Sequence, residues 1–323
     1  MIRLLLIGTL LAAPLYAGDF PFGSIITSGF PVDAGCRSGR NSGFPVANVY
    51  DRGGTMIWHE GGPLAVTAVG HSLVGADQLG QEGGFSVLGT DRVTPFTNMP
   101  LGPRRGTLML ALALTPAGSD AVLALVINQT PPLLEFWLVT RAHGLLLRRG
   151  LPERNDIDIA PPDPIAAIDA DSSGCIVYYT TNRSIARFNV CANVALSDFA
   201  VTRATAIRVL PDGGLLAGKG EILARYDRDG RFLSYVRLSD GNREIGALAI
   251  DVDPRLAWVL MRSADPCDST KSTLLLIDID SGAILNRLET DTRLIDRPRI
   301  AVAGGWYAVE PTSFPPPRRR GVR

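Results

Sequence analysis

Two short carboxylate-rich segments carry the residue types that bind calcium in proteins. They are Asp169-Ala170-Asp171-Ser172-Ser173-Gly174 and Asp251-Val252-Asp253. Alternating carboxylates match the start of a calcium loop, but Pro254 and Arg255 follow the second segment where further ligands are needed. Aspartate and serine side chains also cap tight turns without any metal. Both segments therefore predict hairpin turns, with a weak calcium site at the first as the alternative.

Histidines, the side chains most often used in acid–base catalysis, are few. His59 and His71 flank a Gly-Gly-Pro turn, and the chain has three histidines in all. A general base needs an orienting partner, which the sequence does not identify, so a surface or turn position is the commoner interpretation. The chain has neither a Gly-x-Ser-x-Gly elbow nor a His-Glu-x-x-His helix. The sequence alone leaves open whether the protein is an enzyme.

The N-terminal segment has the pattern of a secretory signal peptide. A positive start at Met1-Ile2-Arg3 precedes an apolar stretch over 4–15, and Ala17-Gly18 offers small residues for cleavage. The apolar stretch is short for a membrane span. We therefore predict a signal peptide over 1–17 and a secreted or periplasmic protein, with an uncleaved anchor as the alternative.

A second apolar stretch covers residues 108–127 but is broken by Pro116, Gly118 and Asp120. A turn in the middle of a bilayer would leave backbone polar groups without hydrogen bonds. The stretch therefore predicts two strands of a hairpin, and no membrane span is expected after signal cleavage. The formal net charge is zero, so no overall field favours nucleic acid as a partner.

Self-similarity is the most informative property of the chain. A hairpin pattern recurs over 49–57, 139–147, 225–233 and 278–285, with apolar alternation, a polar cluster, a glycine and renewed alternation. A second hairpin type precedes the last three of these, over 112–124, 207–217 and 250–259, and residues 165–201 fit both types more loosely. Units begin near 108, 165, 206 and 245, a spacing of about forty to fifty-five residues that is typical of four-stranded propeller blades.

The predicted fold class is therefore an all-β propeller, with six blades, or seven if residues 20–44 add strands of their own. Residues 64–99 form the least regular blade. We expect a closing blade whose first two strands lie over 299–309 and whose other half lies over 46–59, because closure removes exposed sheet edges. The propeller domain is predicted over 18–311, followed by a disordered, proline- and arginine-rich tail over 312–323.

Four cysteines remain after the predicted signal peptide, an even number that predicts disulfides in an oxidising compartment. Four cysteines allow three pairings. We favour Cys175–Cys191, on the second and third strands of one blade, and Cys36–Cys267, since Cys36 precedes the closing blade and Cys267 lies in the blade beside it.

The blade over 207–217 and 222–230 resembles those of NHL-type and gluconolactonase-like propellers, and residues 247–284 are similar. That superfamily contains binding modules, lactone hydrolases and lyases. Its lactonase-like members hold a divalent metal in the central channel. The family's ligands do not map residue by residue onto this sequence, but Asp163, Glu244 and Asp296, near the starts of innermost strands, are candidate ligands for a metal such as calcium. The competing interpretation is that they are solvated loop residues.

We therefore expect a non-enzymatic exported propeller that binds an unknown protein, glycan or small molecule on one face of its ring. This hypothesis depends on the repeat and on the lack of a recognisable catalytic set. The alternative is a metal-dependent lactone hydrolase or lyase with its site in the central channel. Fold alone does not choose between them.

Overall fold

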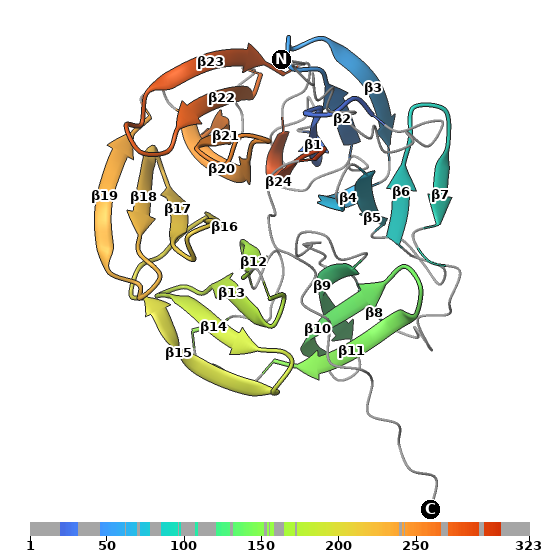
Figure 1. Cartoon of the computed structure of the whole chain (residues 1–323), viewed down its shortest axis with the longest axis vertical. Helices are drawn as coiled ribbons and strands as arrows, with labels where there is room; N and C mark the ends of the chain where they lie inside the picture. Colours follow the sequence, from blue (N-terminus) through green and yellow to red (C-terminus); the bar gives the residue numbers. More distant parts are fainter. Residues whose placement is uncertain are drawn as a thin grey trace, which may run out of the picture.

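The strands of this protein pair into four-stranded antiparallel sheets that stand around a ring (Figure 1). In the part of the chain that the structure describes, there are six such sheets and no helix. The structure is a computed structural model, and it describes residues 20–31, 46–61, 63–69, 72–77, 85–95, 97, 107–108, 121–129, 132–151, 154, 156–157, 165–171, 173–238, 241, 243–265, 271–290 and 294–304. The prediction of an all-β propeller is confirmed.

We number the sheets as blades 1 to 6. Blade 1 contains β24 (Leu294–Val302), β1 (Ile25–Pro31), β2 (Val46–Tyr50) and β3 (Met56–Gly61). Blade 2 contains β4 (Pro63–Val69), β5 (Ser72–Asp77), β6 (Phe85–Leu88) and β7 (Val93–Pro95), and blade 3 contains β8 (Thr107–Leu108), β9 (Ala121–Gln129), β10 (Pro132–Thr140) and β11 (Gly144–Gly150).

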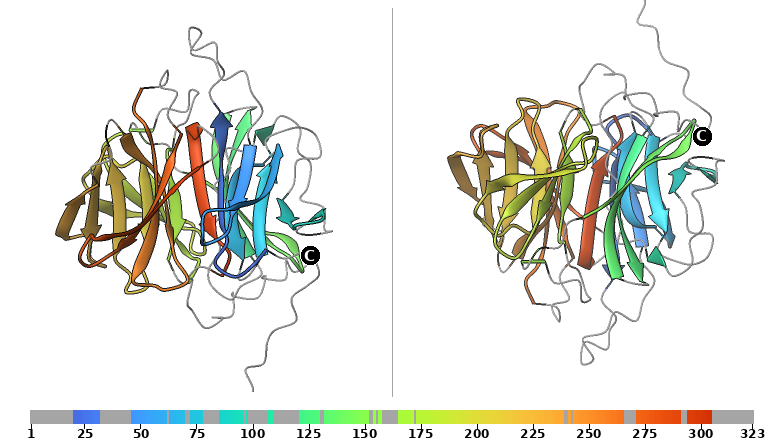
Figure 2. Two further views of the ribbon diagram at one scale, coloured as in Figure 1. Left: turned by 90° about the horizontal axis from the view of Figure 1, so that it is seen from above. Right: turned by 90° about the horizontal axis from the view of Figure 1, so that it is seen from below.

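Blades 4 to 6 follow in sequence order. Blade 4 contains β12 (Ile168–Ala170), β13 (Ile176–Thr180), β14 (Ile185–Asn189) and β15 (Val194–Ala200). Blade 5 contains β16 (Ala206–Val209), β17 (Leu215–Lys219), β18 (Ile222–Tyr226) and β19 (Phe232–Arg237), and blade 6 contains β20 (Arg243–Ile250), β21 (Leu256–Ser263), β22 (Thr273–Asp278) and β23 (Ile284–Glu289). Seen edge on, the strands run between the two faces of the ring (Figure 2).

The turn chemistry predicted for the recurring hairpins is present. Glycine supplies the positive φ in each of the four recurring turns, at Gly54, Gly144, Gly230 and Gly282. In three of these turns an aspartate side chain accepts a hydrogen bond of 2.8–2.9 Å from a backbone N–H of the same turn; the accepting residues are Asp51, Asp227 and Asp278. Local residue chemistry therefore fixes where each outer hairpin reverses.

The two ends of the chain share blade 1, as the sequence pattern predicts. β24 pairs with β1, with Ile25 opposite Val302, and β1 pairs with β2. The predicted division of this blade is wrong, however. Its second strand comes from residues 25–31, whereas the pattern placed it after the turn at Gly304. β24 contributes one strand and the N-terminal part contributes three, so residues 20–44 add a strand to the closing blade itself.

The core is divided into layers between blades. Each layer packs the inward residues of one sheet against the facing side of the next, as expected for strands with side chains of period two. Between blades 5 and 6, for example, Leu216 and Leu223 pack with Val259 and Leu275, all nearly fully buried. Between blades 6 and 1, Trp258 packs with Ile25 and Tyr50. The innermost strands also contact one another in the order β12, β16, β20, β24 and β4.

A disulfide joins Cys175 and Cys191, with an S–S distance of 1.98 Å, and confirms one of the two favoured pairings. The cysteines flank β13 and β14 rather than lying on them, and the Val190 N–H donates to the Cys175 carbonyl at 2.8 Å. The bond therefore clamps the open end of that hairpin. Cys36 and Cys267 lie outside the described residues, as do the predicted signal peptide over 1–17 and the tail over 312–323.

The predicted hairpin in the second apolar stretch is formed by β8 and β9, which pair antiparallel with Leu108 opposite Ile127. Within the described residues, no helix has the length and apolarity needed to cross a membrane.

An arginine with two carboxylate partners attaches the segment before blade 4 to that blade. Arg154 binds both oxygens of Asp156, at 2.8 and 2.9 Å, and both oxygens of Asp198 in β15, at 2.8 and 3.1 Å. Asp156 also accepts from the Thr181 hydroxyl at 2.8 Å. The Arg154 hydrogen bonds lower the pKa of Asp156 to about 2 and lower that of Asp198 as well.

Replacement of Asp156 by asparagine is expected to lower the free energy of unfolding at neutral pH by about 2 kcal/mol. The folded-state pKa of Asp156 is lower than its ordinary 3.8, so its contribution is complete above about pH 4 and is lost as the pH falls to about 2. Urea unfolding between pH 7 and pH 2.5 measures the effect. A deficit in the Asp156→Asn variant that stays constant across that range would contradict this account.

Candidate functional site

A small cavity lies among the innermost strands of the ring. The innermost strands line a cavity of about 40 Å³, with residues 166–168, 206–208, 246–248 and 298–300 and Val66. A cavity of that size holds a few water molecules at most. Gly246 permits the close approach of β20 to β24, because a Cβ at this position would lie 2.7 Å from the Pro298 ring.

The residues implied as metal ligands are placed on two innermost strands. Glu244 is the second residue of β20 and pairs with Arg262 of β21, with Nη2 and Oε1 2.7 Å apart. Asp296 is the third residue of β24 and lies opposite Phe30 in β1. Asp163 lies outside the described residues. Among the residues that the structure describes, no three His, Cys, Asp or Glu side chains are grouped as a metal site.

Both carboxylate-rich segments form hairpin turns. Asp171 accepts the Ile176 N–H at 3.0 Å and the Ser173 hydroxyl at 2.8 Å. In the second segment, the buried Asp251 accepts the Trp258 indole N–H at 2.6 Å. Asp251 also forms an ion pair at 3.0 Å with Arg52 of blade 1, which links two blades. These carboxylates thus hold turns and neighbouring blades.

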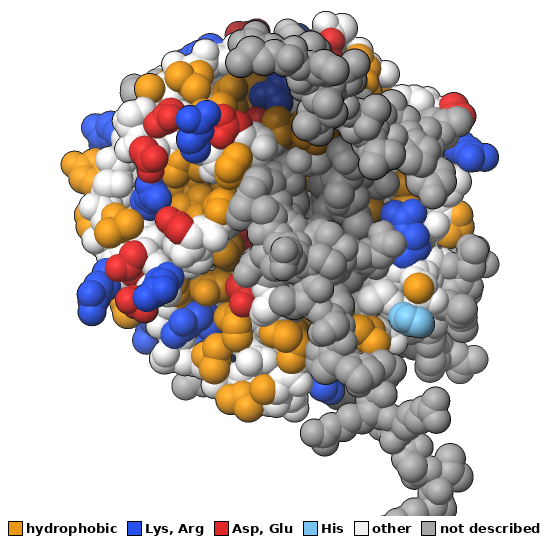
Figure 3. Space-filling model, viewed as in Figure 1, with side chains coloured by type: hydrophobic (Ala, Val, Ile, Leu, Met, Phe, Trp, Pro, Cys, Tyr) orange, Lys and Arg blue, Asp and Glu red, His pale blue; other side chains and the backbone are white. Residues whose placement is uncertain are grey.

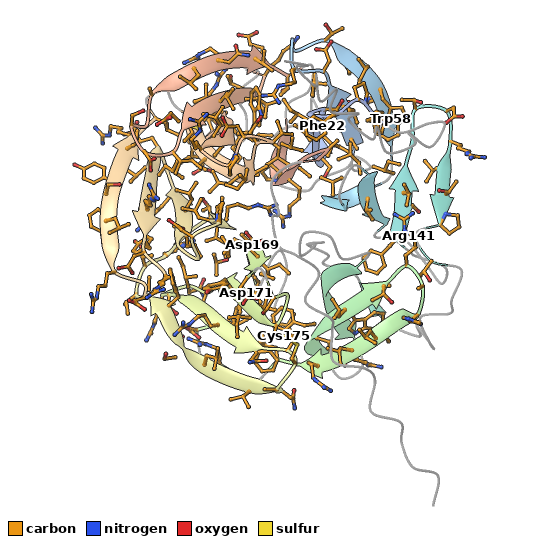
Figure 4. All side chains as sticks on the ribbon, viewed as in Figure 1. Phe22, Trp58, Arg141, Asp169, Asp171 and Cys175 are labelled. Atoms are coloured by element: carbon orange, nitrogen blue, oxygen red, sulfur yellow. A yellow bond between two sulfur atoms is a disulfide. The ribbon has the colours of Figure 1, made fainter. Side chains whose placement is uncertain are left out.

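Asp169 and Asp171 have different roles, and the sequence pattern alone did not distinguish them. It is fully buried at the inner end of blade 4 (Figure 4) and accepts backbone N–H groups from Ala170 at 2.9 Å and Val209 at 2.5 Å. Its third partner is the buried Arg208 of β16, with Nη1 3.5 Å from Oδ1. Burial raises the pKa of Asp169, and the positive charge of Arg208 opposes that rise. The sequence signal for this buried role is a single aspartate between apolar residues in the strand Ile168–Ala170.

His59 lies on β3 opposite Asn48, and its Nδ1 is 2.5 Å from the Asn48 Oδ1. His71 lies outside the described residues. The described part of the chain therefore gives His59 an amide partner on the neighbouring strand.

Ion pairs are numerous on one side of the ring. Figure 3 shows basic and acidic side chains alternating over the part occupied by blades 5 and 6. Arg225 of β18 binds Asp212 in its own blade and Asp280 in the turn after β22. Arg255 binds Asp253 at 2.7 Å. Carboxylates in the same or the neighbouring blade thus neutralise the charges of Arg225 and Arg255.

A second surface feature is a groove on the outer rim of blade 5. It has a volume of about 630 Å³ and lies on the side of blade 5 that faces blade 4. We call it the rim groove and define it by Arg203, Lys219, Tyr226, Phe232, Tyr235 and Arg237, with small and apolar residues between them. Tyr226 and Phe232 lie near one end of their strands, and Lys219 and Arg237 end theirs at the other, so the groove follows the height of the blade.

Aromatic side chains connect the rim groove to the core. Ring centroids are 5.2 Å apart for Tyr178 and Phe199, 6.3 Å for Phe199 and Tyr226, and 5.9 Å for Tyr226 and Phe232. Phe199 is buried, whereas Phe232 and Tyr235 are 57% and 64% exposed. The series is therefore anchored at its inner end and offers two aromatic side chains to solvent at its outer end. Exposed aromatic clusters of this kind are typical of binding surfaces.

The rim groove is also positively charged. Arg237 forms an ion pair with Glu221 at 2.8 Å. Among the described residues, Arg203 and Lys219 form no ion pair. The groove therefore combines exposed rings with two uncompensated cations, which together favour an anionic ligand. Sequence reasoning missed it because its residues come from a loop and three strands of different sequence position.

No protein-family model matches this chain, and no curated protein matches it. A solved structure of a protein of unknown function from Bacteroides caccae aligns with 87% of this chain and 99% of its own length, with a TM-score of 0.60 and 12% identity. The likeness is one of fold. The apo form of AztD from Citrobacter koseri covers 90% of this chain and 100% of its own, at 11% identity, with a TM-score of 0.47. Membership of the NHL-type or gluconolactonase-like group stays a prediction.

Proposed function

We propose that this protein is an exported β-propeller that acts as a binding module, and that the rim groove is its ligand site. The observation that carries the proposal is the exposure of Phe232 and Tyr235 beside the uncompensated Arg203 and Lys219. Aromatic and arginine side chains supply much of the energy of protein binding sites. The ligand is anionic and has flat or apolar parts that pack on the rings.

Two features support the exported location. The N-terminal pattern is that of a signal peptide, and the Cys175–Cys191 disulfide is a kind of bond that persists in oxidising compartments. The binding role is supported by the rigid setting of the groove, because β17, β18 and β19 belong to one sheet whose other face packs into the core between blades 5 and 6.

The double substitution Phe232→Ala and Tyr235→Ala is expected to weaken binding of an anionic probe by about tenfold or more. Calorimetric titration with two probes, polygalacturonate and a glutamate-rich peptide, measures the effect at low and high salt. Binding of the wild-type protein is expected to fall as salt rises, because the groove charges are exposed and therefore screened.

The matched control is the double substitution Ile284→Ala and Leu285→Ala on β23. These side chains are 43% and 55% exposed on the outermost strand of the next blade. The control is expected to bind like the wild type. Equal losses in both double variants would contradict the proposed function.

A further inference from the structure

The outermost strand of blade 5 has few charged residues along its edge. β19 pairs only with β18 in the described sheet, and its six residues include three exposed large side chains, Phe232, Leu233 and Tyr235. Arg237 is its only charged residue. The corresponding strand β23 carries Arg287 and Glu289 in addition to two exposed apolar residues. Natural edge strands are usually protected by charges, so an apolar edge marks a surface to which another strand can be added.

The register shows which backbone groups of β19 are available. The Leu238 N–H donates inward to the Glu221 carbonyl at 2.8 Å, and the register then places Arg237 opposite Ile222 and Tyr235 opposite Ala224. Opposed residues in antiparallel strands alternate between pairs that bond each other and pairs whose N–H and C=O groups point away. The N–H groups of Tyr235 and Arg237 therefore point toward the outer edge of the blade.

The same two residues line the rim groove with their side chains. A strand added along β19 would thus form backbone hydrogen bonds at positions 235 and 237, and it would place alternate side chains over the groove. Arg203 and Lys219 also line the groove, and Lys219 lies on β17 in the same cross-strand row as Arg237, so positive charge lies on the side of the blade over which those side chains extend. Charge complementarity selects acidic residues at these positions.

We infer that the occupant of the rim groove is an extended, acidic peptide segment of a partner protein, which adds to β19 as a fifth strand of blade 5. This inference rests on the proposed function and specifies its ligand. Backbone hydrogen bonds supply part of the affinity, and the groove supplies the preference for acidic and aromatic or apolar side chains in alternation.

The test separates backbone pairing from side-chain contact. A displayed library of random peptides of about twelve residues is selected against the full-length protein, and an enriched peptide is measured by calorimetry against four single variants.

The variants distinguish the side chain from the backbone. Tyr235→Ala removes the ring, and Tyr235→Pro removes the ring and the outward N–H. Proline is tolerated on an edge strand at a position whose backbone nitrogen faces away from the sheet, because no hydrogen bond of the ladder is lost there. Arg287→Ala and Arg287→Pro are the corresponding variants on β23, where Arg287 lies opposite Leu275 in an equivalent outward-facing pair. The first removes the Arg287 side chain, and the second also removes its N–H, which donates to the Asn286 Oδ1 at 2.8 Å.

We expect enrichment of acidic peptides, a loss of about tenfold for Tyr235→Ala, and a further loss of about tenfold for Tyr235→Pro. The two Arg287 variants are expected to bind equally. If Tyr235→Pro does not fold, the backbone hydrogen bonds are removed from the peptide instead, by methylation of alternate backbone nitrogens. The methylated peptide is expected to lose binding.

Equal binding by Tyr235→Pro and Tyr235→Ala, together with undiminished binding of the methylated peptide, would overturn strand addition. Polygalacturonate binding that depends on Phe232 and Tyr235, without enrichment of any peptide, would overturn it while leaving the rim groove as the ligand site. Failure of both probes and of the library would overturn the proposed function as well.

Discussion

Replacement of Arg208 by methionine is expected to lower the free energy of unfolding by about 3–5 kcal/mol. Arg208 is buried beside the fully buried Asp169, and the two join the innermost strands of blades 4 and 5. Removing the guanidinium leaves the carboxylate without its compensating charge in a low-dielectric setting. Methionine retains an unbranched apolar side chain, so the loss of charge dominates over the loss of packing. Urea unfolding of the variant and the wild type measures the difference.

The pH dependence of that deficit distinguishes charge from packing. Burial already raises the pKa of Asp169 above its ordinary 3.8, and loss of Arg208 raises it further. A carboxyl whose folded-state pKa exceeds its unfolded value destabilises the fold at high pH, and the penalty decreases as the pH falls toward 3.8. The deficit of Arg208→Met is therefore expected to shrink on acidification. The double variant Asp169→Asn with Arg208→Met removes the buried charge and is expected to recover part of the stability at pH 7. A pH-independent deficit would show that packing is responsible.

Replacement of Gly230 by alanine is expected to cost about 3 kcal/mol of unfolding free energy. Gly230 has a φ of +82°, which costs an L-residue about 1–2 kcal/mol. In addition, a Cβ at this position would lie 1.9 Å from the backbone carbonyl oxygen of Phe199 in blade 4. A backbone atom cannot rotate away as a side chain does, so blades 4 and 5 must separate locally.

Gly220 provides the matched control within the same blade. It has a φ of +57°, and a Cβ there would meet no atom within 4 Å. Gly220→Ala is expected to cost about 1 kcal/mol, from backbone strain alone. Thermal or urea unfolding of the two variants separates strain from the clash between blades. Equal costs would mean that the contact with Phe199 relaxes freely.

The same contact recurs around the ring, which gives the turn glycines a second role. A Cβ on Gly282 would lie 2.2 Å from a methyl group of Val236 in blade 5, and a Cβ on Gly54 would lie 2.8 Å from a methyl group of Leu288 in blade 6. In each case the turn between the third and fourth strands of one blade packs against the outermost strand of the blade before it. The hairpin pattern contains these glycines and their positive φ values account for them locally, but the inter-blade contact is visible only in the assembled ring.

Turn chemistry and alternation explain why the outer hairpins were predictable. Asp227 and Gly230 act within five residues of each other, and the strands beside them have period two, so both signals are local. The Cys175–Cys191 bond was predictable for the same reason, because it closes a short hairpin. The second strand of blade 1 was not, because the pairing of Ile25 with Val302 joins residues at opposite ends of the chain.

The sequence by itself determined an all-β ring of repeated hairpins, latched where its ends meet, because alternation and turn residues act over a few positions. Only the tertiary structure decided that Asp169 faces Arg208, that Glu244 is paired with Arg262, and that Arg203, Tyr226 and Tyr235 share one groove. The Asp169–Arg208 contact depends on how far blade 5 is rotated against blade 4, whereas the Glu244–Arg262 pair depends on the register between β20 and β21. That rotation is set by side-chain packing between sheets, which a one-dimensional pattern does not contain.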